Sequence, residues 1–156
     1  SVDGRSCGVQ RETRAQVPPG VLHVAAAQTP QPVYLPAATK RFTFTVQAEE
    51  RPAGPYFLSC HINDANGGVV AQCDSRLAGG WFQPDRPQEV TLDLHQPWLK
   101  PGTYTVDVFL CRVGIIDAWD GAVTFDVEPE LPYAATGTAE SYGRGMVLAD
   151  FDYEVR

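Results

Sequence analysis

Residues 57–74, FLSCHINDANGGVVAQCD, contain two short runs of alternating apolar and polar residues separated by Asn66-Gly67. Alternation with a period of two is typical of strands that place one face on a core and the other in solvent. Asn-Gly is the strongest two-residue hairpin signal, because both residues accept positive φ. The segment therefore predicts a β-hairpin that joins Phe57–Asn63 to Val69–Asp74.

A turn at Asn66-Gly67 also predicts which residues of the two strands face each other. A turn shifted by one residue would move the partners by two and leave each side chain on the same face. The predicted pairs are Cys60 with Cys73 and Ile62 with Ala71 on the inward face, and His61 with Gln72 and Ser59 with Asp74 on the outward face.

The facing cysteines have two interpretations. Cys60 and Cys73 would be close enough for a disulfide in an oxidising compartment. We favour two reduced thiols packed as small apolar groups in the core. The N-terminus carries no signal-peptide h-region, and Cys7 and Cys111 have no obvious partners.

The rest of the chain keeps the period of two, and 14 Gly and 13 Pro punctuate it, a content that long helices do not tolerate. Further strands are predicted over 41–46, 88–95, 103–110, 122–127 and 146–155. The fold class is therefore all-β, an antiparallel, immunoglobulin-like (jelly-roll-like) sandwich over 21–156. The polar stretch 1–20 ends in Pro-Pro-Gly and is interpreted as a flexible linker or leader.

Composition and spacing exclude several function classes. The formal net charge is -7, and binding to nucleic acid or anionic lipid needs a basic patch that this composition does not offer. Neither Lys40 nor Lys100 follows Gly, so no phosphate-binding P-loop is present. The sequence also lacks a helical H-E-x-x-H zinc motif, a C-x-x-C pair, a G-x-S-x-G elbow and an apolar run long enough to span a membrane.

A series of landmarks follows the order seen in one protein family. The resemblance begins at about residue 21 and covers roughly 135 residues. Its motifs are FTFTV at 42–46, IND at 62–64, LKPGTYTV at 99–106, IDAWDGAVTFDV at 116–127 and YGRGMV at 142–147. This ordered set resembles the C-terminal carbohydrate-binding domain of Wzt, the ATP-binding subunit of bacterial O-antigen polysaccharide ABC transporters.

The resemblance implies a non-catalytic β-sandwich, without cofactor or metal, that binds the modified non-reducing end of the exported glycan on one sheet. It also implies a homodimer that exchanges the terminal strand 146–155, a transmembrane transporter subunit as partner through the parent protein, and a cytoplasmic location. Phe151 and Tyr153 stand where many members carry Trp. The family's nucleotide-binding domain is missing here, which leads us to expect an excised or stand-alone recognition module.

Sugar recognition needs aromatic rings for C–H faces and planar polar groups for hydroxyls, all on a solvent-facing surface. Arg112 would suit an acidic sugar but could instead pair with Asp107 or Asp117, and Phe109 could lie under a loop or in a dimer contact. His61 could be only a cross-strand partner of Gln72, and the Trp119 ring could be tucked into the sandwich end. The carbohydrate-binding candidates are His61, Gln72, Asp74, Asp107, Phe109, Arg112, Trp119 and Trp81.

Two other functions compete with glycan recognition. A β-sandwich can bind protein by adding a strand at a sheet edge, with 147–155 as the docking element. A glycosidase would need two suitably spaced carboxyls, for which Asp107 with Asp117, or Asp117 with Asp120, are the candidates. Solvated turn carboxylates explain these acids better, because a compact sandwich with few long loops has little means of burying one acid, so no catalytic residue is assigned. No calcium site is expected either, because the turn already explains Asn66.

Overall fold

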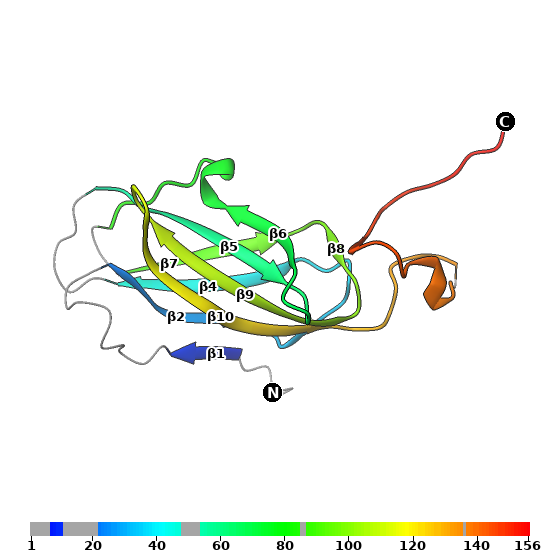
Figure 1. Ribbon diagram of the computed structural model, residues 1–156, viewed down its shortest axis with the longest axis horizontal. Helices are drawn as coiled ribbons and strands as arrows, with labels where there is room; N and C mark the ends of the chain where they lie inside the picture. The colour runs from blue at the N-terminus through cyan, green and yellow to red at the C-terminus, as the bar shows by residue number, and fades with distance from the viewer. Residues whose placement is uncertain (1–6, 11–21, 48–53, 85–86, 136) are drawn as a thin grey trace.

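The computed structural model describes residues 7–10, 22–47, 54–84, 87–135 and 137–156. They form an all-β sandwich in which two sheets lie face to face (Figure 1). Within the part of the chain so described, no helix has the length and apolar character needed to cross a membrane. The predicted fold class is confirmed.

The first sheet has the order β1-β2-β4-β7 and is antiparallel throughout. The second sheet has the order β3-β10-β9-β5-β6, and β8 pairs with β11 in a separate two-stranded ladder. The strands are β1 Cys7–Gln10, β2 His23–Thr29, β3 Val33–Tyr34, β4 Lys40–Gln47, β5 Phe57–Asn63, β6 Val69–Asp74, β7 Gln88–Leu94, β8 Trp98–Leu99, β9 Gly102–Cys111, β10 Ile115–Val127 and β11 Val147–Leu148. Two short 3-10 helices are η1 Ser75–Ala78 and η2 Ala139–Ser141.

Three features of this topology differ from the sequence-based expectation. Residues 7–10 of the expected linker 1–20 form β1, which pairs with β2 and so extends the first sheet; the rest of 1–20 lies outside the described residues. The short strand β3 runs parallel to β10. The predicted strand 146–155 is limited to β11, and the chain from 149 onward has no described strand partner (Figure 1).

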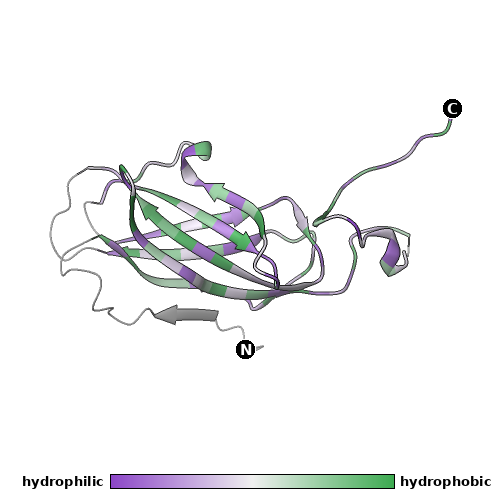
Figure 2. Ribbon diagram, in the orientation of Figure 1, coloured by the Kyte–Doolittle hydropathy of each residue, from purple (hydrophilic) through white to green (hydrophobic). Residues whose placement is uncertain are grey.

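The core lies between the sheets and follows the predicted alternation, visible in Figure 2 as changing hydropathy along the strands. In β4 the inward residues Phe42, Phe44 and Val46 are buried, whereas Arg41 and Gln47 are exposed. The rings of Phe42 and Phe125 pack with centroids 5.1 Å apart and join the two sheets. Burial of such rings supplies much of the hydrophobic stabilisation of a sandwich.

The β5–β6 hairpin has the predicted register but a different turn. Cys60 faces Cys73 and His61 faces Gln72. Asn66 does not have the positive φ that the Asn-Gly signal predicted; of the turn residues only Gly67 does, at φ 81. The Asp64 carboxylate accepts hydrogen bonds from the backbone N–H groups of Asn66 and Gly68, both at 2.9 Å. This Asx turn makes the loop longer than the predicted two-residue turn. A register shift between Ile62 and Asn63 absorbs the difference, so the pairs from Ser59–Asp74 to Ile62–Ala71 are the predicted ones.

Candidate functional site

The outward face of the β9–β5–β6 region carries most of the candidate sugar-binding residues. Ser59 of β5 lies between Phe109 of β9 and Asp74 of β6, its cross-strand partners on either side. Along its own strand Ser59 is flanked by Phe57 and His61, which point to the same face because side chains alternate. A small residue surrounded by four larger ones leaves a depression in the sheet surface.

This depression, called the Ser59 hollow below, has a volume of about 340 Å³. It brings together four of the eight predicted residues, namely His61, Gln72, Asp74 and Phe109. Its lining consists of Phe57, Ser59, His61, Gln72, Asp74, Arg76, Phe109, Cys111, Val113, Gly114 and Ile115. The hairpin register thus predicted the centre of the hollow.

Two aromatic groups stand beside each other in the hollow. The rings of His61 and Phe109 have centroids 4.9 Å apart and planes tilted by 54°. The Phe57 ring is covered instead, because the Arg76 guanidinium carbon lies 3.8 Å from its centroid and Trp81 meets it edge-on at 5.0 Å. Phe109 and His61 are therefore the rings of the hollow that are able to take a C–H face of a ligand.

Arg76 forms a wall that sequence reasoning missed. It belongs to η1, whose N-cap Asp74 accepts a hydrogen bond from the Arg76 backbone N–H at 3.0 Å. The Arg76 side chain returns to the same carboxylate, with Nε–Oδ1 at 3.0 Å and Nη2–Oδ2 at 2.9 Å. These hydrogen bonds from Arg76 hold the pKa of Asp74 below its usual value, so the pair stays ionised.

Hydrogen-bonding groups surround the floor of the hollow. Gln72 is exposed, and its side-chain Nε2 donates to the Ser59 hydroxyl at a long 3.4 Å. His61 is half-buried, and its cross-strand neighbour on β9 is Asp107. The Asp107 carboxylate accepts from Asn63 Nδ2 and from the Gly121 backbone N–H, each at 2.7 Å. Asp107 therefore lies beside the hollow, and its carboxylate links β9 to β5 and β10.

The remaining three predicted residues lie elsewhere. Arg112 packs against Gly54, since a Cβ on Gly54 would come within 2.8 Å of its Nη2, and it does not line the hollow. Trp119 is only 7% exposed and belongs to the core, which corrects the expectation of an exposed platform. Trp81 is 49% exposed, as predicted, and reaches the hollow only through its contact with Phe57.

Asp107 and Asp117, one of the two carboxyl pairs considered for glycosidase chemistry, do not face one substrate; in the other pair Asp120 is exposed whereas Asp117 is buried. Asp117 pairs across the strands with the core residue Leu110, is 7% exposed and accepts a hydrogen bond from the Val24 backbone N–H at 2.9 Å. Asp107 points to the opposite face of the same sheet. Two carboxyls on opposite faces cannot flank one glycosidic bond. Among the described residues, moreover, no group of three metal-ligating side chains converges.

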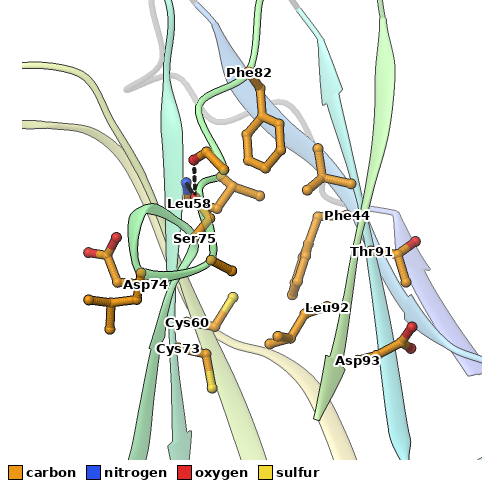
Figure 3. Close-up of a pocket in the computed structure, with 14 residues that line it drawn as sticks. Phe44, Leu58, Cys60, Cys73, Asp74, Ser75, Phe82, Thr91, Leu92 and Asp93 are labelled. Carbon is orange, nitrogen blue, oxygen red and sulfur yellow. Dashed lines mark hydrogen bonds between the residues drawn. The ribbon is translucent and has the colours of Figure 1, made fainter.

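A second cavity, of about 500 Å³, opens between the sheets beside the edge strands β6 and β7. Figure 3 shows Phe44, Leu58, Cys60 and Leu92 directed into it, while the Asp74 and Asp93 carboxylates point away. Asp93 is held by Arg41 at 2.7 Å. The sulfurs of Cys60 and Cys73 are not bonded to each other, and burial raises the pKa of both thiols, so neither is an activated nucleophile.

The chain was compared with known protein families, curated proteins and solved structures. No protein-family model matches the chain, and no curated protein does. A solved structure of a β-glucuronidase from glycoside hydrolase family 2 is similar over 68% of this chain, at 16% sequence identity and a TM-score of 0.42. The match covers 12% of that enzyme's chain, so this protein corresponds to a small part of it. Activity does not transfer across a likeness this low.

Proposed function

We propose that this protein is a non-catalytic carbohydrate-binding module and that the Ser59 hollow is its sugar subsite. The observation that carries the proposal is the tilted pair of His61 and Phe109 beside the small Ser59. An apolar ring face next to Ser59 and Gln72 matches the two needs of a pyranose, a C–H face to stack and hydroxyls to bond. The separation of Asp107 from Asp117 supports binding without turnover.

The finer proposal is that the ligand is the modified non-reducing end of a bacterial O-polysaccharide. It rests on the ordered motifs that resemble the Wzt carbohydrate-binding domain, among them LKPGTYTV at 99–106 and IDAWDGAVTFDV at 116–127. Such a module would act beside a transmembrane transporter subunit on the cytoplasmic side of the inner membrane. The hollow supports this role because it would accommodate a terminal sugar.

The test is a calorimetric titration with O-polysaccharide from the source organism, in parallel with the same glycan lacking its non-reducing end. We expect binding to the intact glycan alone. The variant Ser59→Leu fills the hollow and should abolish that binding while the protein stays folded. Equal binding of both glycans would mean that the repeat unit is recognised. Binding of neither would overturn the proposal and favour a protein-docking module.

The C-terminal segment 146–155 is proposed to pair with a second copy of the chain. From 149 to 155 its apolar residues alternate with acidic ones, and Phe151, Tyr153 and Val155 are 63%, 93% and 97% exposed. Such a pattern fits a strand that lacks its neighbour. Sedimentation velocity should give a dimer for the full chain and a monomer after removal of 149–156. A monomeric full chain would rule out the exchange.

A further inference from the structure

The charges of the Ser59 hollow limit which sugar it would accept. Of the described residues that line it, Asp74 and Arg76 are the only ones of the Asp, Glu, Lys and Arg types, and their side chains are bound to each other through two hydrogen bonds. Asp107, on the neighbouring strand position, adds a negative charge beside the hollow. An anionic sugar would therefore meet an ion pair whose two charges offset each other and, beside it, the Asp107 carboxylate, which repels it.

Arg112, the residue expected to bind an acidic sugar, lies outside the hollow. Arg112 packs against Gly54 and is absent from the lining of the hollow. Arg76 in addition lies over the Phe57 ring, with its guanidinium carbon 3.8 Å from the ring centroid. Turning it toward a carboxylate or phosphate would break both the ring contact and the pair with Asp74, so an acidic cap would lose more contacts than it gains.

The side of the hollow formed by the β9–β10 turn is apolar and exposed. Val113 and Ile115 are 108% and 64% exposed, and both line the hollow together with Phe109 and Cys111. Exposed aliphatic side chains next to a binding depression are stabilised when a ligand removes them from water. A methyl group on the sugar would make that contact, whereas a hydroxyl or a charged group would be desolvated against it.

We infer that the Ser59 hollow selects a neutral terminal sugar that carries a methyl substituent, as an O-methyl or a 6-deoxy group, over an acidic sugar. Phe109 and His61 would take the C–H face of the ring. Ser59 and Gln72 would bond its hydroxyls, and Ile115 with Val113 would cover the methyl group. This inference rests on the proposed function, because it names the ligand of the same site.

The test uses immobilised synthetic oligosaccharides that end in 3-O-methylmannose, rhamnose, unmodified mannose or glucuronic acid. We expect the wild-type protein to bind the methylated or 6-deoxy ends at least tenfold more tightly than mannose, and to bind glucuronic acid no better than mannose. Ile115→Ser should reduce the preference below threefold. Val69→Ser is the matched control, because Val69 is also exposed, at 52%, but lies outside the hollow.

A charge variant tests the electrostatic part. Asp74→Asn removes the partner of Arg76 and should raise binding of the glucuronic acid end at least threefold, an increase lost in 0.5 M salt. Strongest wild-type binding to glucuronic acid, or equal binding to the methylated and unmodified ends, would overturn this inference and leave the proposed function standing. Binding of none of these ends, with the titration of whole polysaccharide also negative, would overturn both.

Discussion

The His61 and Phe109 rings lie 4.9 Å apart on neighbouring strands although 48 positions separate them in the sequence. They meet because β5 and β9 pair so that Ser59 faces Phe109 and His61 faces Asp107. The diagonal between His61 and Phe109 is short enough for rings to touch across an antiparallel ladder. The small Ser59 leaves the exposed side of both rings uncovered.

We predict that Phe109→Ala and His61→Ala each weaken glycan binding tenfold or more. Both side chains point outward, so the melting temperature should change by no more than about 5 °C. The measurement is calorimetric titration together with thermal unfolding of each variant. Thr91→Ala, on the outer face of the other sheet, is the control and should bind as the wild type does. Wild-type affinity in both ring variants would place the sugar elsewhere.

Truncation of Trp119 and of Trp81 should lower the stability of the protein by different amounts. Trp119→Ala empties a core position and is expected to lower the free energy of unfolding by about 3–5 kcal/mol. Trp81→Ala removes a half-exposed ring that touches Phe57 edge-on, so its cost should be about 1 kcal/mol. Urea unfolding of both variants measures the difference. Equal costs would contradict the burial of Trp119.

Trp119 also shows where sequence reasoning fails. Alternation predicted the faces of β4, β5 and β9, because a strand without interruption keeps strict parity. In β10 the register shifts between Ile115 and Asp117 and again between Trp119 and Val123. Each irregularity breaks the alternation count, so a motif such as 116–127 does not reveal which of its side chains point inward.

Sequence reasoning missed Arg76 and predicted the C-terminal strand too long, for a different reason. Arg76 lies beyond the end of β6 and reaches the hollow through a 3-10 turn that Asp74 caps, which no periodicity signals. Residues 149–155 do alternate, but a strand needs a neighbour to pair with, and only Val147–Leu148 find one in β8. Pattern therefore predicts strand propensity, whereas tertiary pairing decides the strand.

The four cysteines should all titrate as free thiols. Cys60 and Cys73 face each other on β5 and β6, and burial raises the pKa of each thiol, which disfavours the thiolate that disulfide formation needs. A thiol assay under denaturing, non-reducing conditions should count four, the number of cysteines in the chain. A count of two would mean that Cys60 and Cys73 are oxidised. Each single variant, Cys60→Ala or Cys73→Ala, should then raise the count from two to three, because the partner thiol is released.

Tyr56 should make the stability depend on pH in the alkaline range. Its ring is fully buried, its hydroxyl donates to Gln88 Oε1 at 2.5 Å, and burial raises the pKa of Tyr56 to about 12. The unfolded chain ionises this phenol near pH 10, about its ordinary value. The contribution of Tyr56 is therefore complete below pH 10 and is lost between pH 10 and 12, by about 1 kcal/mol per pH unit.

The comparison of wild type with Tyr56→Phe isolates this contribution from those of the other titrating groups. At pH 8 the wild type should be more stable by about 1 kcal/mol, because the variant lacks the hydrogen bond to Gln88. The gap should close at about pH 11 and reverse toward pH 12, because the phenylalanine ring has no proton to lose. Tyr153→Phe serves as the control, since Tyr153 is 93% exposed. A gap that stays constant up to pH 12 would show that the Tyr56 phenol is not held neutral by burial.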